Sequence, residues 1–343
     1  APQPAGCAGL MRKILYRLVV FFVVVCVLLS ALFASVLLTP ISLERTTVDF
    51  TITPGSSLRA ATREIAAAGI ELDPWALILL ARMLGVESSI KAGSYEIAHG
   101  VTQLQLLRKL TRGDFTQAEL AFIEGWTFRQ MRERLDAHPE LRHETTGIPE
   151  TEIMRLLGVP ETAAEGLFFP DTYLFAKRSS DVELLARAYR AMQRHLAREW
   201  SARAAGLPYG DPYQALIMAS IVEKETGRDQ DRSLVAAVFV NRLRQGMLLQ
   251  TDPTVIYGLG NHFDGNLRKS DLLADTPYNT YKRAGLPPTP IAMPGLAALR
   301  ATLHPAPSDA LYFVARGDGT SHFSNTLLEH NQAVTRYQRG GKP

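Results

Sequence analysis

The sequence predicts an α+β protein with one N-terminal transmembrane helix, a small α+β domain, and a larger mixed α/β domain of long helices and short strands. Three observations support this prediction. An uncharged apolar run occupies Leu18–Leu38, short strand and helix patterns alternate across residues 45–115, and long helical patterns begin near residue 181. With 343 residues, the chain is long enough for an anchor and about two further domains.

The apolar run predicts a transmembrane helix over residues 15–39, because about 20 uncharged residues can cross the hydrocarbon core of a membrane. Arg12, Lys13 and Arg17 lie at its N-terminal side. By the positive-inside rule, residues 1–14 stay in the cytoplasm and the rest of the chain is exported. We therefore expect a single-pass protein of the inner (cytoplasmic) membrane whose larger domain is periplasmic or extracytoplasmic.

A cleaved signal peptide is the alternative, and Ala31, Ala34 and Ser35 are small enough to form a cleavage site. The apolar run is long for such a peptide, which favours an uncleaved anchor. Met11 would make a natural start, so residues 1–10 are either an upstream extension or extraneous sequence.

Residues 45–115 are predicted to form the small α+β domain. Thr46–Ile52 is rich in β-forming residues, and Ser56-Ser57 caps a predicted helix over Leu58–Ala68. A second helix follows Asp73-Pro74, a strand covers the end of Lys91–Ile97, and a third helix covers Thr102–Leu110. This order resembles LysM-type glycan-binding modules, and a plain spacer domain is the alternative.

Residues 117–343 are predicted to form the larger domain. It begins with a strand through Phe122-Ile123, followed by loops and short helices up to an aromatic loop at Leu167–Tyr173. Beyond the long helices we expect mixed loops, short strands and a hairpin around Gly317–Gly319. The long predicted helices are Asp181–Ala204, Tyr213–Thr226, Asp229–Gln245 and Thr326–Tyr337.

The charge and cysteine content exclude several classes of protein. With 37 basic and 34 acidic residues, the chain lacks the cationic excess that binds nucleic acid, so we expect no nucleic-acid partner. Its only cysteines are Cys7 and Cys26, which precede the predicted export boundary. The exported part therefore has no disulfide and no thiolate nucleophile.

The segment Ala219–Gly227 carries the best candidate for catalysis. At about 100° per residue, Met218, Ile221, Val222 and Glu225 share one helical stripe, so Glu225 continues an apolar face. Both desolvation and the negative end of the helix dipole disfavour its ionised form. Glu225 is thus predicted to be a general acid that still carries a proton near neutral pH.

Glu223 lies on a smaller and more polar stripe, where it would support the site or form a structural ion pair. From spacing alone, a purely structural role for both glutamates at the end of a helix is slightly favoured. A glycosidase usually needs a second carboxylate. Asp252 precedes Pro253 and could simply cap a turn, and no other acid is singled out among Asp171, Asp264, Asp271 and Asp275.

A second cluster spans Thr276–Tyr281 and the proline-rich segment Gly285–Ile291. Tyrosines can stack on sugar rings while Asn and Thr side chains bond hydroxyl or N-acetyl groups, and prolines stiffen the loop. A surface loop with buried tyrosines explains the pattern equally well. The histidines and carboxylates show no metal-ligand spacing, so we expect neither a metal nor a cofactor.

Taken in order, four motifs resemble the endolytic murein transglycosylase family, also called YceG-like or MltG-like. The resemblance covers about residues 40–340. The motifs are Ala219–Thr226 (ASIVEKET), Leu249–Gly258 (LQTDPTVIYG), Tyr278–Tyr281 with Gly285–Pro288, and Phe323 through His330-Asn331. Thr289 and Met293 depart from the family pattern, so neither is included as a sugar contact.

The resemblance implies a lyase that cleaves MurNAc–GlcNAc bonds within nascent peptidoglycan strands, leaves 1,6-anhydro-MurNAc ends and terminates glycan elongation. Glu225 matches the family's catalytic glutamate, acting first as acid and then as base on the MurNAc 6-hydroxyl. The implied partners are glycan strands and, among proteins, peptidoglycan synthases or components of the divisome or elongasome. The matching substrate-binding positions are Glu223, Gln250, Thr251, Asp252, Tyr257, Tyr278, Asn279, Thr280, Asn325 and Asn331.

A non-catalytic glycan-binding scaffold of the cell-wall synthesis machinery is the competing hypothesis. The anchor and the LysM-like order of residues 45–115 are equally compatible with it. The two hypotheses differ in whether the protein needs the carboxyl of Glu225 for its function in cells.

Overall fold

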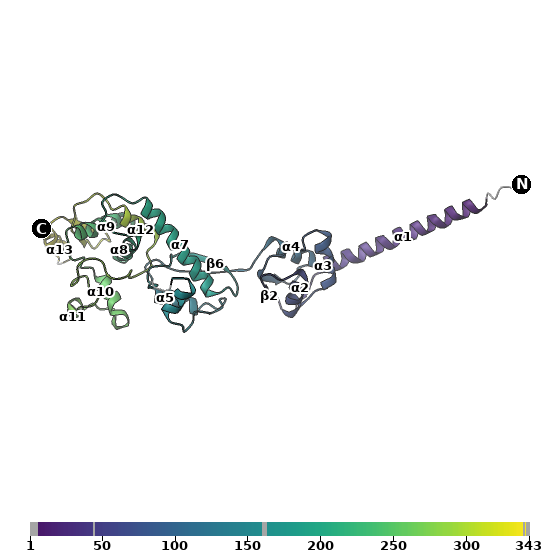
Figure 1. Cartoon of the computed structure of the whole chain (residues 1–343), viewed down its shortest axis with the longest axis horizontal. Helices are drawn as coiled ribbons and strands as arrows, with labels where there is room; N and C mark the ends of the chain where they lie inside the picture. The colour runs from purple at the N-terminus through teal and green to yellow at the C-terminus, as the bar shows by residue number, and fades with distance from the viewer. Residues whose placement is uncertain (1–5, 44, 160–162, 339, 341–343) are drawn as a thin grey trace. The chain divides into compact units, whose positions relative to one another are not determined.

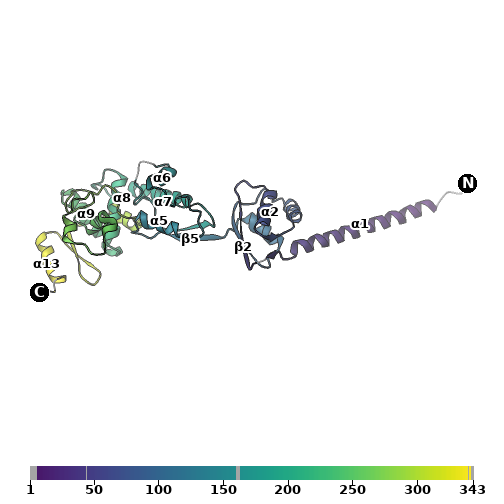
Figure 2. The same ribbon diagram turned by 90° about the horizontal axis from the view of Figure 1, so that it is seen from below.

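The computed structural model describes residues 6–43, 45–159, 163–338 and 340. The chain divides into two compact units (Figures 1 and 2). The first unit comprises residues 1–118 with 176–178, and the second comprises residues 119–175 with 179–343.

The first unit begins with the long helix α1 and continues with short strands and three helices. Its described elements are α1 (Gly6–Leu38), β1 (Ser42–Leu43), β2 (Thr47–Ile52), α2 (Leu58–Ala67), β3 (Ile70–Glu71), α3 (Pro74–Met83), β4 (Gly93–Ala98) and α4 (Gln103–Arg112). These bounds confirm the predicted strands and helices of residues 45–115 to within a few residues.

Local sequence signals explain where the helices of this unit begin. Asp73 caps α3 by accepting hydrogen bonds from two backbone N–H groups, and Pro74 occupies the first helical position, where its missing N–H has no cost. Thr102 and Gln105 form a capping box at α4. Between the helices, β2 and β4 pair in antiparallel register, and the rings of Phe50 and Tyr95 stack with centroids 5.5 Å apart. The aromatic pair lies at the centre of the unit's core.

Within α1, the segment Leu15–Ser35 is long and apolar enough to cross a membrane, and no side chain that the structure describes in it is fully buried. At about 1.5 Å of rise per residue, its 21 residues match the roughly 30 Å hydrocarbon core of a bilayer. The helix extends further toward the N-terminus than the predicted span, since it begins at Gly6.

The second unit is mainly helical. Its described elements are β5 (Gln117–Ala121, which starts at the boundary), α5 (Phe128–Asp136), α6 (Glu150–Leu156), β6 (Thr172–Ala176), α7 (Asp181–Ser201), α8 (Pro212–Glu225), α9 (Asp229–Arg244), α10 (Asp252–Leu259), the 3₁₀ helix η1 (Gly260–His262), α11 (Lys269–Leu273), α12 (Leu296–Leu303), β7 (Tyr312–Ala315), β8 (Ser321–Ser324) and α13 (Leu327–Tyr337). Strands β5 and β6 pair with each other, as do β7 and β8.

The long helices and the terminal hairpin confirm the prediction, but three other expectations were wrong in part. The strand predicted through Phe122-Ile123 ends at Ala121, and the chain then turns, with the N–H of Trp126 donating to the carbonyl of Ile123 (3.2 Å). The region between α9 and β7 contains three α-helices and a 3₁₀ helix where mixed loops and short strands were expected. The aromatic loop is also shorter than predicted, since Thr172 opens β6.

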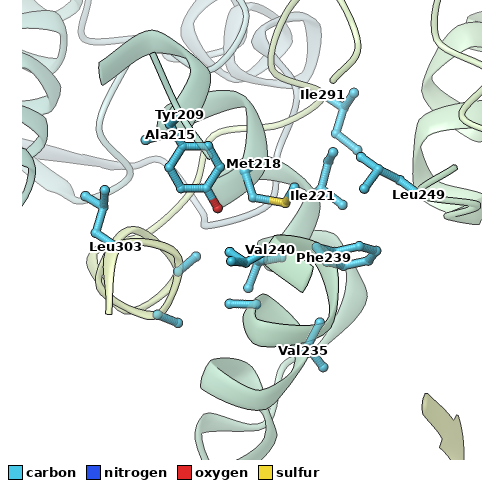
Figure 3. Close-up of a cluster of buried hydrophobic side chains, with 14 residues drawn as sticks. Tyr209, Ala215, Met218, Ile221, Val235, Phe239, Val240, Leu249, Ile291 and Leu303 are labelled. Carbon is cyan, nitrogen blue, oxygen red and sulfur yellow. The ribbon is translucent and has the colours of Figure 1, made fainter. Parts of the chain in front are cut away.

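Helix α8 contributes Ala215, Met218, Ile221 and Val222 to the cluster of buried hydrophobic side chains drawn in Figure 3. Every residue from Ala215 to Val222 is buried, which explains why the helix has little amphipathic character. Helices α9 and α12 pack against it, and Phe239, Leu249 and Ile291 contribute to the same cluster. This rigid, apolar surrounding fixes the end of α8, where Glu225 lies.

Candidate active site

A cleft of about 360 Å³ opens in the second unit at the end of α8. Its walls come from α9, from the loop before α10, from β7 and from the first turns of α13. The residues that line it are Glu225, Phe239, Arg242, Leu249, Gln250, Asp252, Tyr281, Tyr312, Phe313, Leu327 and His330.

Glu225 is the last residue of α8 and is half-buried in this cleft. Burial raises its pKa above the ordinary value, and the nearby charge of Asp252 raises it further. A hydrogen bond from the hydroxyl of Thr251 and the charge of Arg242 act in the opposite direction. Burial is the largest of these effects, so Glu225 keeps a proton at higher pH than a solvated glutamate, as a general acid must.

The loop before α10 places Thr251 against Glu225. Gln250 has a positive φ of 50°, a conformation that a side chain other than glycine adopts rarely and at some energetic cost. The backbone N–H of Gln250 donates to the carbonyl of Thr280 (3.1 Å), and that of Thr251 donates to the Thr280 hydroxyl (3.1 Å). Thr251 and Thr280 are both buried, so these hydrogen bonds hold the loop from the side that faces the protein interior.

Asp252 is exposed at the edge of the cleft, and its carboxylate accepts a hydrogen bond from the hydroxyl of Tyr281 (2.6 Å). Burial and the Asp252 charge together raise the pKa of Tyr281. Tyr281 therefore stays protonated and holds Asp252 in place. The cleft thus contains a second carboxyl besides Glu225.

Arg242 on α9 joins two walls of the cleft. It is 8% exposed, and its guanidinium donates to the carbonyls of Leu248 (3.2 Å) and Leu249 (2.9 Å) in the loop before α10. It also donates to the carbonyl of Leu311 (2.7 Å), just before β7. This one side chain holds the loop that carries Thr251.

Another part of the cleft lining is aromatic. The rings of Tyr312 and His330 stack with centroids 5.2 Å apart, and the Arg242 guanidinium lies 5.0 Å from the centre of the Tyr312 ring. Flat rings of this kind suit the apolar face of a sugar. The sequence prediction missed both residues. The motif that ends in His330-Asn331 could have indicated His330 as a candidate.

Glu223 belongs to α8, but its carboxylate lies at the N-terminus of α12. Its carboxylate accepts a hydrogen bond from the N–H of Gly295 (3.0 Å), the residue that precedes α12. A negative charge at a helix N-terminus is favourable. Burial raises the pKa of Glu223, but the side chain does not line the cleft.

Asn279 and the tyrosines make contacts within the protein. Asn279 is buried, and its side-chain amide donates to the carbonyls of Leu272 (3.1 Å) and Ala274 (2.6 Å). Tyr257 and Tyr278 form an edge-to-face pair with centroids 4.9 Å apart. These contacts hold the turn that carries Thr280 and Tyr281.

The cleft therefore brings together part of the predicted set. Glu225, Gln250 and Asp252 line it, and the buried hydroxyl of Thr251 donates a hydrogen bond to the carboxylate of Glu225. Asn325 and Asn331 are exposed on or beside α13. The predicted residues that do not line the cleft are Glu223, Thr251, Tyr257, Tyr278, Asn279, Thr280, Asn325 and Asn331. Within the described ranges, no three His, Cys, Asp or Glu side chains are grouped as a metal site.

Glu165 is a buried carboxyl that the sequence prediction missed. It is 6% exposed, and it accepts hydrogen bonds from the N–H of Phe128 (3.0 Å) and the hydroxyl of Tyr257 (3.1 Å). Burial raises the pKa of Glu165 to about 7. Its carboxylate links the start of α5 to α10. The loop that contains Glu165 has no periodic pattern from which its burial could be predicted.

We predict that the stability of the protein falls as the pH rises from about 5 to 8, and that Glu165→Gln removes much of this fall. The folded state favours the protonated carboxyl, so this contribution is present below the ordinary pKa and is lost as pH rises through about 7. The shift corresponds to on the order of 3 kcal/mol of unfolding free energy.

Thermal unfolding of the full chain in detergent at several pH values measures this effect. Glu133→Gln, an exposed carboxyl on α5, is the matched control and should keep the parent's pH dependence. Equal pH dependence in Glu165→Gln and the parent would contradict the prediction.

One protonatable carboxyl at the end of a rigid helix, in a cleft with polar and aromatic walls, defines a site suited to general acid–base catalysis. The YceG-like family model matches residues 50–336, and the chain belongs to that family.

Individual relatives extend the match along the chain. An endolytic murein transglycosylase of Bacillus subtilis is 32% identical over 324 residues, which cover 89% of each protein. One of Streptococcus pneumoniae is 29% identical over 284 residues, covering 73% of this chain and 51% of that protein. The chain therefore matches about half the length of the streptococcal relative.

A crystal structure of a yceG-like protein from Listeria monocytogenes has a similar fold. It aligns with a TM-score of 0.54 and 31% sequence identity, and it covers 84% of this chain and 98% of the Listeria chain.

Proposed function

We propose that this protein is a membrane-anchored endolytic murein transglycosylase, a lyase that cleaves MurNAc–GlcNAc bonds within peptidoglycan strands. The observation that carries the proposal is Glu225, a partly buried carboxyl with a raised pKa in a cleft at the end of α8. The relatives' name supports the same activity.

In the proposed mechanism Glu225 first donates its proton to the glycosidic oxygen, and the bond from that oxygen to C1 of MurNAc breaks. The resulting carboxylate then accepts the proton of the MurNAc 6-hydroxyl while the 6-oxygen bonds to C1. This closes the 1,6-anhydro ring, returns Glu225 to its protonated form and consumes no water. Thr251 orients the carboxyl through its hydrogen bond.

The proposal includes the location of the protein. The apolar segment of α1 would cross the cytoplasmic membrane, with Arg12, Lys13 and Arg17 on the inner side and the chain from residue 39 onward outside. The strand and helix order of residues 45–115 supports a LysM-like unit in contact with glycan. Both units would then act on strands that are still close to the membrane, where their cleavage would end elongation.

Asp252 favours a second candidate function, a muramidase-type hydrolase. It lines the same cleft as Glu225, and paired carboxylates are the usual arrangement for hydrolysis of a glycosidic bond. In that reaction a water molecule would be added to the MurNAc end.

The masses of the products separate the two candidates. We expect purified murein digested by the full chain in detergent to give MurNAc ends that are lighter than reducing ends by one water. In heavy-oxygen water, these ends should carry no label. Products with labelled reducing ends would establish the hydrolase instead.

Two substitutions should shift the pH dependence of this activity in opposite directions. Asp252→Asn removes a charge that raises the pKa of Glu225, so the alkaline fall in kcat/KM should move to lower pH. Thr251→Val removes a hydrogen bond that lowers the same pKa, so the fall should move to higher pH. The pH dependence of kcat/KM on soluble glycan fragments measures the shift in each variant. If both variants shift in the same direction, Glu225 is not the acid.

A further inference from the structure

Helix α3 of the first unit is apolar on all sides. Its sequence is Pro-Trp-Ala-Leu-Ile-Leu-Leu-Ala-Arg-Met, with Arg82 as its one charged residue. A helix of this composition is normally surrounded by protein or lipid. One side packs into the unit through Ala76, Leu77, Ile78, Leu80 and Ala81.

The other side of α3 is exposed. Trp75, Leu79 and Met83, here called the α3 stripe, are 74%, 48% and 68% exposed. They follow one another at intervals of four residues, so they lie within one narrow arc of the helix. Scattered exposed apolar residues are ordinary, but three that adjoin on one apolar helix indicate a surface that is covered in use.

The end of α1 fixes where this stripe lies. Phe33, inside the apolar segment Leu15–Ser35, packs against the cluster formed by α3 and α4. Figure 1 shows α3 beside the end of α1. Three residues after α1 ends, Ile41 is buried in the unit, and its N–H donates to the carbonyl of Val101 (2.8 Å).

The first unit is thus held directly at the end of the apolar segment, with no free linker between them. Any bilayer that α1 crosses would have its interface at the level of Phe33, and therefore at α3. Tryptophan is enriched at this level because its ring is apolar while its N–H can still reach water.

From this geometry we propose that the α3 stripe lies in the lipid interface of the membrane that α1 crosses. Helix α3 is then a second membrane contact that holds the first unit against the bilayer surface. The inference rests on the proposed anchoring by α1. Its test reports separately on the anchoring by α1 and on the membrane contact of α3.

Fluorescent labels on single cysteines in the full chain test the proposal, after reconstitution into phosphatidylethanolamine and phosphatidylglycerol vesicles with brominated acyl chains. Leu79→Cys in a Cys7→Ser, Cys26→Ala background reports on the stripe, and Thr51→Cys in the same background is the control. Thr51 is exposed on β2, which lies away from α1 in both Figures 1 and 2. The native Cys26, with Cys7→Ser, reports on α1.

We expect brominated lipid to quench the labels at positions 79 and 26 several-fold more strongly than the label at position 51. Quenching at 26 without quenching at 79 overturns the proposal and leaves the anchor intact. No quenching at 26 overturns the anchor and the proposal together. A label at 79 that is shielded from water-soluble quenchers but not quenched by lipid means that protein covers the stripe, which also overturns the proposal. Met83→Cys repeats the test if Leu79→Cys perturbs folding.

Discussion

Glu225→Gln is expected to lower the rate of glycan cleavage by at least about 10²–10⁴-fold, the usual contribution of a positioned acid or base. The amide of glutamine neither donates a proton to the glycosidic oxygen nor accepts one from the 6-hydroxyl. Its oxygen can still accept the hydrogen bond from Thr251, and its volume is nearly that of glutamate. The loss should therefore appear in kcat, with folding unchanged.

Product release from purified murein by the full chain measures this loss. Glu223→Gln is the matched control, because Glu223 lies two residues away on α8 but bonds the N–H of Gly295, an interaction that the glutamine oxygen retains. It should stay close to the parent. Full activity of Glu225→Gln in cells would instead support the glycan-binding scaffold.

The position of Glu225 could be predicted because the necessary information is local. Met218, Ile221 and Val222 share its helical stripe and are fully buried in the structure. Leu216, Ala219 and Ser220, on the stripe of Glu223, are fully buried as well, so the stripe predicts a carboxyl at the edge of the core without separating the two glutamates. A helix repeats every 3.6 residues whatever its surroundings, so a carboxyl that continues a buried stripe must lie at the edge of the core. The same local periodicity is present in α2 and α7, which were also predicted.

The surroundings of Glu225 depend on contacts that periodicity cannot show. Arg242 reaches residues 248–249 on one side and Leu311 on the other, and Glu165 meets Tyr257 across 92 positions of sequence. Asn279 was expected to bind sugar because of its type, yet its amide holds backbone carbonyls. Polar residues in a motif can be required by the fold as much as by the substrate.

The helices after α9 were missed for a different reason. Asp252-Pro253 was taken as a turn, the commoner use of this pair, whereas proline in the first turn of a helix is also favourable. The signal was present in the sequence, but α10 has only eight residues and no distinct polar face. Short helices of this kind depend on tertiary packing more than on local preference.

Arg242→Met is expected to destabilise the second unit by on the order of 3 kcal/mol and to reduce activity even where the protein stays folded. The substitution leaves the carbonyls of Leu248, Leu249 and Leu311 without their donor, and unsatisfied buried groups cost about 1–3 kcal/mol each. Partial access of water to the cleft offsets some of this cost. The loop that holds Thr251 against Glu225 then loses its attachment to α9 and keeps its two hydrogen bonds to Thr280.

Thermal unfolding and murein digestion of the full chain in detergent measure the two effects. Arg244→Met is the matched control on the same helix, since Arg244 is exposed and donates to one carbonyl, that of Gly206 (2.9 Å). Its effect should stay below about 1 kcal/mol. Arg242→Lys keeps the charge but cannot reach both walls with one planar group, so it should restore only part of the stability. If Arg242→Met loses stability but keeps full activity at low temperature, the loop holds its position without this arginine.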